Sequence, residues 1–176
     1  MGTILIPGWL QKKELYDGFE VYDVWNKNLS LTYPEPHKYV VGHSIGANIA
    51  LYNWSKNKNQ RLILINPLLP KRSLLSWFWR WLNNITPEDV SRALSPNSTD
   101  ISHLFAALRF DPSPILKEIP KENIVVIRGS LDHHFCDENA KNFIRSLDIK
   151  IIETETKHKW SKEYKMKIEE IMRNWS

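Results

Sequence analysis

The 176-residue sequence predicts an α/β fold in which a mostly parallel, six-stranded sheet is covered by helices on both faces. Short runs of β-branched and aliphatic residues alternate with helical patterns along almost the whole chain. Several of these runs are apolar without interruption, as expected of strands buried on both faces. The length suits a single domain, 1–176, because domains average roughly 150 residues.

The strands expected from these runs are short and evenly distributed. The first is apolar throughout and ends at a Pro-Gly pair at 7–8, a typical turn signal. The expected strands are residues 3–6, 19–24, 39–41, 62–65, 124–127 and 149–152.

Helical patterns lie between these strands. Residues 47–54 are crowded with apolar side chains, which suits a helix packed on the sheet. A helix start is expected at 86–89, where Thr-Pro-Glu-Asp combines a cap, a first-turn proline and two acids. Ser161 is expected to cap a final helix whose apolar face is Tyr164, Ile168, Ile171, Met172 and Trp175. The insertion at about 67–118 has helical patterns and no strand, so we expect it over the carboxyl ends of the strands.

Composition excludes several classes of protein. Hydrophobic residues make up 42% and charged residues 25%, which is typical of a globular domain and not of a disordered chain. Cys136 is the only cysteine, so no intrachain disulfide is expected. We find no signal-peptide pattern and no apolar run long enough to span a membrane, and we expect a cytoplasmic protein. Charges of both signs are interspersed along the sequence and sum to +4. The sequence contains no nucleic-acid-binding module, so no nucleic-acid partner is expected.

The clearest motif is Gly-His-Ser-Ile-Gly at 42–46, directly between an expected strand and an expected helix. A sharp strand-to-helix turn there exposes the hydroxyl of Ser44 in a strained backbone conformation. Gly42 and Gly46 remove side chains that would collide in the turn. The pattern indicates a nucleophilic serine.

With this motif the sequence resembles the α/β-hydrolase superfamily, in particular its small serine esterases. The resemblance implies the chain order Ser, Asp, His, with the acid after a late strand and the histidine after the last one. By this resemblance the acid is Asp132, in the Gly-Ser-Leu-Asp turn after the strand 124–127. The histidine is His158, in the loop after the strand 149–152. It further implies a minimal fold that lacks the usual N-terminal strand pair, with the strand order 2-1-3-4-5-6. No helix is expected in the short segment 24–39, which contains two prolines.

Other histidines and acids are weaker candidates, because they do not follow a strand or lie too close to a stronger candidate. The histidines set aside as surface or packing residues are His37, His43, His103, His133 and His134. Among the acids, Asp137 resembles a helix start, and Asp111 precedes a proline as turn residues do.

Acyl transfer also needs two backbone N–H groups to stabilise an oxyanion. Ile45, which follows the serine, is expected to supply one. In this superfamily the other comes from the loop after the first central strand, which here reads Pro7-Gly8-Trp9 in place of the usual His-Gly-x. We therefore expect Trp9 N–H as the second donor, with Gly8 allowing close approach.

The insertion contains a tryptophan-rich segment at 73–82. One helical face is expected to carry Leu74, Leu75, Phe78, Trp81, Leu82 and Ile85, with Trp77 and Trp79 outside it. The preferred interpretation is a short lid that forms an acyl pocket. Simple packing on the domain stays open. Docking on a membrane through Lys71, Arg72 and Arg80 is disfavoured but also stays open.

These observations predict a serine hydrolase that cleaves a carboxylic ester or thioester without a metal or an organic cofactor. The Pro-Gly-Trp and Gly-His-Ser motifs are also similar to those of pimeloyl-acyl-carrier methyl ester esterases. An acidic acyl carrier protein is therefore a candidate partner for basic residues of the insertion, although four acids nearly cancel their charge. A non-catalytic interaction protein that uses the tryptophan-rich insertion is the alternative. The basic residues are Lys71, Arg72, Arg80, Arg92 and Arg109, and the acids are Glu88, Asp89, Asp100 and Asp111.

Overall fold

The computed structural model describes residues 2–26, 28–34, 37–87, 90 and 101–175. Four charged residues of the insertion, Glu88, Asp89, Arg92 and Asp100, lie outside these residues, and so does part of the helix start predicted at 86–89. None of the described helices is both long and apolar enough to cross a membrane.

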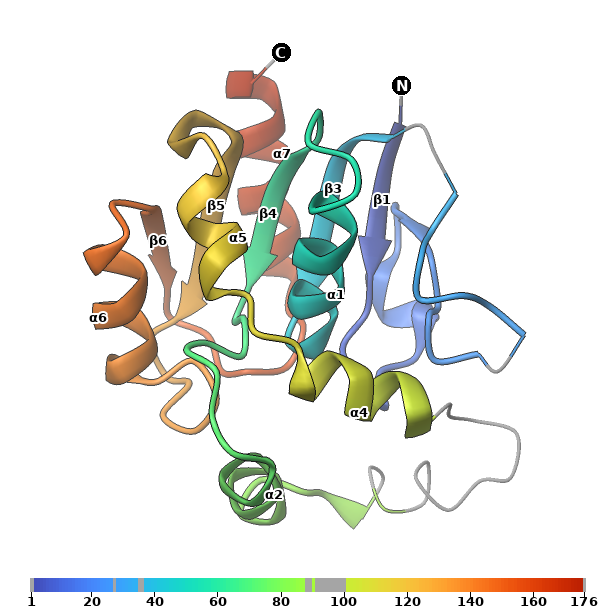
Figure 1. The fold of residues 1–176 in the computed structure, drawn as a ribbon, viewed down its shortest axis with the longest axis vertical. Helices are drawn as coiled ribbons and strands as arrows, with labels where there is room; N and C mark the ends of the chain where they lie inside the picture. The colour runs from blue at the N-terminus through green and yellow to red at the C-terminus, as the bar shows by residue number, and fades with distance from the viewer. Residues whose placement is uncertain (1, 27, 35–36, 88–89, 91–100, 176) are drawn as a thin grey trace.

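Six parallel strands form one sheet in the order β2-β1-β3-β4-β5-β6, which confirms the predicted order (Figure 1). Because every neighbouring pair is parallel, all the strands end at the same edge of the sheet. Segments that follow different strands therefore meet at that edge. The strands are β1 (Gly2–Ile6), β2 (Glu20–Val21), β3 (His37–His43), β4 (Arg61–Ile65), β5 (Ile124–Gly129) and β6 (Lys150–Thr154).

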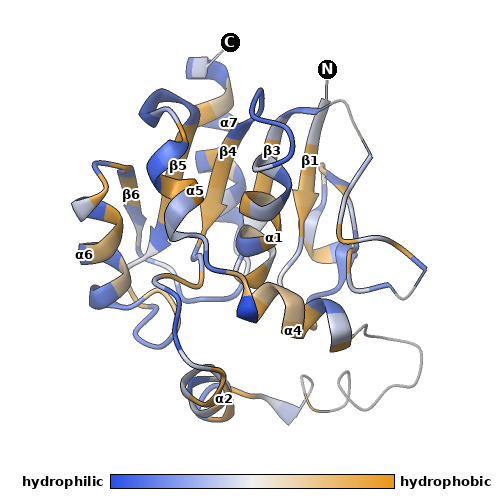
Figure 2. Cartoon of the chain, in the orientation of Figure 1, coloured by the Kyte–Doolittle hydropathy of each residue, from blue (hydrophilic) through white to orange (hydrophobic). Residues whose placement is uncertain are grey.

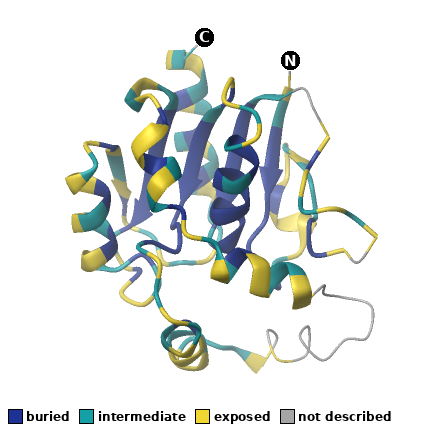
Figure 3. Ribbon diagram, viewed as in Figure 1, coloured by how far each residue is buried: buried dark blue, intermediate teal, exposed yellow. Residues whose placement is uncertain are grey.

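The central strands are buried on both faces, as their unbroken apolar sequences predict. In β4, Leu62 and Leu64 contribute to one hydrophobic cluster, whereas Ile63 and Ile65 contribute to the other. This alternation follows from the two-residue period of a strand. The central strands β3, β4 and β5 are accordingly among the most hydrophobic and most buried parts of the molecule (Figures 2 and 3), whereas β2 and most of β6 are exposed or half-buried.

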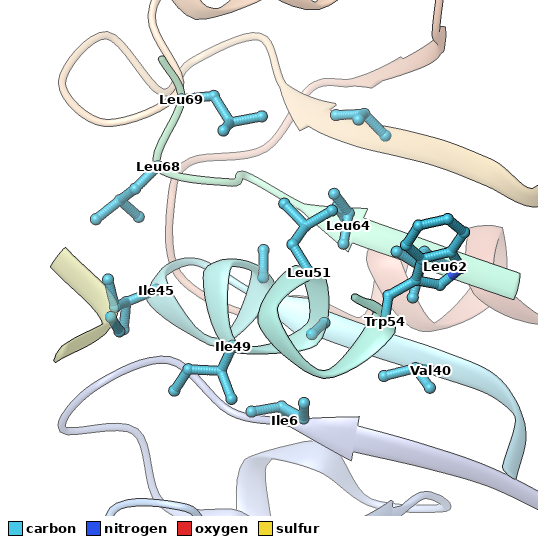
Figure 4. Packing of buried hydrophobic residues seen from close by; sticks show 14 of the residues in the cluster. Ile6, Val40, Ile45, Ile49, Leu51, Trp54, Leu62, Leu64, Leu68 and Leu69 are labelled. Carbon is cyan, nitrogen blue, oxygen red and sulfur yellow. The ribbon is translucent and has the colours of Figure 1, made fainter. Parts of the chain in front are cut away.

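Helices cover both faces of the sheet. On one face α1 packs through residues such as Ile49 and Trp54 against β1, β3 and β4 (Figure 4). The other face is covered by Tyr16 and by Tyr164, Ile168 and Ile171 of α7. The described helices are η1 (Lys13–Tyr16), α1 (Ile45–Trp54), α2 (Leu74–Leu82), α4 (Ile101–Arg109), α5 (Ser113–Glu118), η2 (Lys121–Asn123), α6 (Glu138–Ser146) and α7 (Lys162–Trp175).

The second strand is shorter than predicted. The sequence indicated strand over 19–24, but β2 holds only Glu20 and Val21. The chain bends directly afterwards, because Val24 N–H donates to the Tyr22 carbonyl and Trp25 N–H donates to the Asp23 carboxylate. No helix occurs among the described residues between this bend and β3, as expected.

The insertion lies at the edge where the strands end. In Figure 1, α2 and α4 lie beyond the carboxyl ends of β3, β4 and β5, whereas both chain ends lie at the opposite edge. The α5 helix buries Leu116 completely in the main core cluster, to which Trp77 of α2 also belongs. Part of the segment 67–118 therefore belongs to the helical layer of the domain.

Candidate active site

Ser44 occupies a sharp turn between β3 and α1. Its backbone has φ 55° and ψ −126°, a conformation that costs a non-glycine residue about 1–3 kcal/mol. Two hydrogen bonds hold the turn: Ser44 N–H donates to the Ile65 carbonyl at 2.8 Å, and Ala47 N–H donates to the Ser44 carbonyl at 3.0 Å. The sheet thus enforces the strained conformation predicted from the motif.

The two flanking glycines permit close packing of this turn. A Cβ atom on Gly42 would lie 2.5 Å from the Cα of Ala47, and one on Gly46 would lie 2.6 Å from the Pro7 carbonyl oxygen. Neither position accepts a side chain without a backbone shift. Gly8 lies on the other side of the turn, close to the Cβ of Ser44.

Asp132 lies in the loop after β5 and is almost completely buried. Its Oδ1 accepts from the backbone N–H groups of His134 and Phe135, at 3.3 and 3.0 Å, and its Oδ2 accepts from that of Cys136 at 3.0 Å. Three N–H groups converging on one carboxylate fix both the loop and the direction of the side chain.

A continuous hydrogen-bonded chain joins Ser44, His158 and Asp132. His158 Nδ1 lies 2.6 Å from Asp132 Oδ2, and His158 Nε2 lies 2.7 Å from Ser44 Oγ. An ionised carboxylate can only accept, so Nδ1 carries the proton and Nε2 accepts the Ser44 hydroxyl proton. These three side chains come from loops after β3, β5 and β6, and the structure brings together all three that the sequence had singled out.

The surroundings of Asp132 favour its ionised form. Burial alone would raise its pKa, but the charge and hydrogen bond of the His158 ring oppose burial. The N–H groups of Phe135 and Cys136 add to this effect, and the net result is a pKa well below the ordinary value for aspartate. An ionised Asp132 holds the His158 ring in one tautomer and stabilises a positive charge on it.

The two expected oxyanion donors come from the start of α1 and from the loop after β1. Ile45 is the first residue of α1, where backbone N–H groups have no partner within the helix. Trp9 lies in the loop after β1, and the next residue, Leu10, has a positive φ of 63°. Trp9, Ser44 and Ile45 all line the same cavity.

That cavity has a volume of about 740 Å³. Its base carries Ser44 and His158, and its walls are mainly apolar side chains from α2, α4 and the loops after β1, β4 and β5. The apolar walls include Leu68, Leu74, Trp77, Phe78, Trp81, Leu104, Leu108 and Phe135.

The expected inner face of α2 is confirmed for Leu74, Phe78 and Trp81 but is wrong at two positions. Trp77 was placed outside the inner face, but its side chain is only 4% exposed and lines the cavity. Leu75 was placed on the inner face but is 65% exposed. The inner positions follow the helical spacing i, i+3, i+4 and i+7 from Leu74. The sequence pattern favoured a neighbouring stripe because apolar side chains cover more than half of the helix surface and leave only a narrow polar side at Ser76 and Arg80. The residues on the cavity are Leu74, Trp77, Phe78 and Trp81.

Two arginines of the insertion are engaged by Asp137. Arg72 and Arg80 donate to its two carboxylate oxygens at 2.7 and 3.0 Å, and Arg80 also donates to the His134 carbonyl. Asp137 also caps α6 by accepting from Ala140 N–H at 3.0 Å, which agrees with the helix start predicted there. This carboxylate therefore joins α2 to the loop that carries Asp132.

The remaining candidates are not part of the hydrogen-bonded chain of Ser44, His158 and Asp132. His103 Nδ1 lies 2.8 Å from the Val24 carbonyl oxygen, and Asp111 accepts from Ser113 N–H in a turn. His133 and His134 are exposed at the cavity. Among the residues that the structure describes, no group of three His, Cys, Asp or Glu side chains could hold a metal ion.

Sequence reasoning missed several residues that hold the His158 loop. Asn66 is fully buried, donates to the carbonyls of Lys157 and His158, and accepts from Gly129 N–H at 2.7 Å. Tyr164 donates to the Lys157 carbonyl at 2.6 Å. The position of Asn66 directly after a buried strand is the one sequence signal that could have identified it.

Comparison with known proteins supports the architecture. The sequence matches no known protein family and no curated protein. Among solved structures it is similar to a monoacylglycerol lipase of Paleococcus ferrophilus, with 15% identity and a TM-score of 0.59 over 99% of this chain and 94% of the lipase. It is also similar to an α/β hydrolase enzyme from a metagenome of Mar Chica lagoon sediments, with 16% identity and a TM-score of 0.56 over 99% and 90%. For BioG from Haemophilus influenzae the identity is 14% and the TM-score 0.54, over 89% and 87%. At these identities the likeness shows a shared fold.

Proposed function

We propose that this chain, which has the α/β-hydrolase fold, is a serine hydrolase that cleaves a carboxylic ester or thioester through an acyl-enzyme on Ser44. The observation that carries the proposal is the chain Ser44 Oγ, His158 Nε2, His158 Nδ1 and Asp132 Oδ2, with both hydrogen bonds at 2.6–2.7 Å and an apolar cavity beside it. Serine is a weak nucleophile unless a base takes its proton, and the geometry provides that base.

The reaction then proceeds in two halves. Ser44 Oγ attacks the carbonyl carbon while its proton moves to His158 Nε2, and the N–H groups of Ile45 and Trp9 stabilise the oxyanion. Collapse of this intermediate breaks the bond to the alcohol or thiol, which leaves with the proton from His158. Water then attacks the acyl-enzyme, gives its proton to His158, and Ser44 regains that proton as the acid departs.

The cavity favours an apolar acyl group. Its volume of about 740 Å³ lies within the usual range for small-molecule sites, and its walls carry aromatic and aliphatic side chains from α2 and α4. We therefore assign α2 and α4 the role of a lid that forms an acyl pocket. No cofactor is required by this chemistry, and a cytoplasmic location is part of the proposal.

A methyl ester carried by an acyl carrier protein is a second candidate substrate. The Pro-Gly-Trp sequence at 7–9 and the Gly-His-Ser sequence at 42–44 favour it by their resemblance to methyl ester esterases that act on carrier-bound chains. An acidic carrier would meet exposed cations such as Lys71 and Lys157. Arg72 and Arg80 contribute less than their sequence positions suggest, because Asp137 already engages both.

Labelling with a fluorophosphonate probe tests the hydrolase directly. We expect the wild-type protein to be labelled and Ser44→Ala to be unlabelled. Ser146→Ala is a matched control, because Ser146 ends α6 and bonds only to the Phe143 carbonyl. A folded wild-type sample that takes up no label would exclude the serine hydrolase and favour the non-catalytic interaction protein.

The substrate range is measured separately. Hydrolysis of p-nitrophenyl esters from acetate to palmitate should show kcat/KM rising with chain length until the cavity is filled. A flat profile would argue against an acyl pocket under α2 and α4. Hydrolysis of a methyl ester on acyl carrier protein, compared with the same free methyl ester, tests the second candidate.

A further inference from the structure

His43, the residue before Ser44, makes hydrogen bonds through both ring nitrogens although it is completely buried. Its Nε2 lies 2.9 Å from the backbone carbonyl oxygen of His158, and its Nδ1 lies 2.8 Å from the Tyr16 hydroxyl. A carbonyl oxygen can only accept, so Nε2 carries the proton and Nδ1 accepts from Tyr16. These two bonds join the turn at Ser44 to the backbone of His158 and to Tyr16.

The environment keeps this ring neutral. Complete burial, followed by the nearby His158 ring, lowers the pKa of His43 to about 3. The ring therefore keeps one donor and one acceptor across the whole neutral range. The bond to the His158 carbonyl does not depend on the protonation of His43 at neutral pH.

Tyr16 extends this network to the loop after β1. Its hydroxyl accepts from Gly8 N–H at 3.1 Å, lies 3.2 Å from Gln11 Oε1 and is fully buried, with its ring 4.5 Å from the ring of Trp160. Gly8 precedes Trp9, the proposed second oxyanion donor. A run of three hydrogen bonds thus connects the loop after β1 to the backbone of His158.

The loop that carries His158 needs such support. Residues 156–160 have no helical or strand structure, so their position depends on bonds to other elements. The His158 carbonyl accepts from His43 and from Asn66, and these bonds fix the main chain from which the imidazole projects. A small displacement of that main chain would move Nε2 away from Ser44 Oγ.

We propose that His43 and Tyr16 are positioning residues, which hold the His158 backbone and the oxyanion loop at Gly8 in one rigid frame around Ser44. The proposal rests on the proposed hydrolase function. It assigns to the histidine of the Gly-His-Ser motif a role in aligning two loops that are distant in sequence. Neither His43 nor Tyr16 is among the described residues that line the active-site cavity.

Side-chain substitutions distinguish positioning from packing. His43→Leu removes both bonds, whereas His43→Gln keeps an N–H donor near the position of Nε2. We expect His43→Leu and Tyr16→Phe to lower kcat for p-nitrophenyl butyrate by about 10-fold or more, with KM changed less than about twofold. His43→Gln should recover most of the lost kcat.

Tyr33→Phe is the matched control for loss of a buried tyrosine hydroxyl. The Tyr33 hydroxyl bonds to Gln60, which precedes β4 at the opposite edge of the sheet. Its kcat should stay within about twofold of wild type. A folded Tyr16→Phe variant with wild-type kcat would overturn the proposal, as would a His43→Gln variant as slow as His43→Leu.

A measurement without turnover separates this proposal from the proposed function. Proton NMR of the His158 Nδ1–H, which lies in the short bond to Asp132, reports the position of the ring even in an inactive protein. We expect this resonance to shift or broaden in His43→Leu and Tyr16→Phe but not in Tyr33→Phe. An unchanged resonance in both variants would overturn the positioning role. Absence of fluorophosphonate labelling in the wild-type protein would instead contradict the proposed serine hydrolase function.

Discussion

Two neighbouring regions of this molecule are built in opposite ways. The site around Ser44 is formed by loops that directly follow β3, β5 and β6, and backbone hydrogen bonds fix each of them. The α2 helix beside it has one fully buried residue, Trp77, and exposes Leu75, Phe78 and Trp79 by half or more (Figure 3). The same cavity therefore has a rigid base and a loosely held cover.

The difference indicates how the two regions respond to change. Atoms at the base must keep positions within fractions of an ångström for proton transfer, so they depend on the buried sheet. The cover needs only to present apolar surface, which many arrangements can do. Local unfolding should therefore begin at α2, where little apolar area is buried, and should affect the segments at the carboxyl ends of the strands last.

Asp132→Asn should have the largest effect on the rigid region. We expect kcat to fall by about 10⁴-fold, because an amide no longer selects the productive His158 tautomer. Steady-state hydrolysis of a p-nitrophenyl ester measures it. Asp111→Asn is the matched control, since its turn bond to Ser113 N–H survives the change. Equal losses in the two variants would contradict the assigned role of Asp132.

Two tryptophan substitutions compare the buried and exposed sides of α2, the helix that covers the cavity, by their effect on the unfolding free energy. Trp77→Ala removes a side chain that is 4% exposed and should cost about 3 kcal/mol of unfolding free energy. Trp79→Ala removes one that is 58% exposed and should cost less than about 0.5 kcal/mol. Urea denaturation decides this. If the two substitutions lowered the unfolding free energy by similar amounts, α2 would not be oriented with Trp77 buried and Trp79 exposed.

The pH dependence of stability probes the buried His43. Its pKa is about 3 in the folded protein, against an ordinary value of 6.5, so only the unfolded chain binds a proton between these values. Above pH 6.5 the effect vanishes, and below it the unfolding free energy falls by up to about 1.4 kcal/mol per pH unit. The groups that face the ring are His158, Asp132, Tyr16 and Tyr164.

Urea denaturation between pH 5 and 7.5 checks this slope. His43→Gln should lose it, and the difference between the two proteins should shrink as the pH falls. A constant difference between wild type and His43→Gln across that range would mean that His43 does not titrate as expected.

Asp137→Asn should have the smallest effect and should act on the cover alone. Asparagine still caps α6, but the charge that engages Arg72 and Arg80 is lost. Because these partners are 11% and 28% exposed, we expect a cost of about 1 kcal/mol and a KM raised a few-fold at constant kcat. Thermal melting and ester kinetics measure both. A fall in kcat instead would show that α2 also supports the base of the cavity.

Sequence reasoning succeeded where local pattern decides structure. Strands that alternate with helices predicted the parallel sheet, and the resemblance to α/β-hydrolases predicted the strand order and the placement of Ser44, Asp132 and His158 at one edge; the structure shows all three. It did not find the bond between His43 and the His158 carbonyl, because partners 115 positions apart leave no spacing to read. It also misjudged Trp77, which lies at the border between the broad apolar side of α2 and its narrow polar side at Ser76 and Arg80.

The position of the two chain ends has a practical consequence. Both ends lie at the sheet edge opposite α2 and α4 (Figure 1), the helices whose side chains line the cavity. A purification tag, a fluorescent protein or a solid support joined at either end would therefore be attached on the side of the sheet away from the cavity.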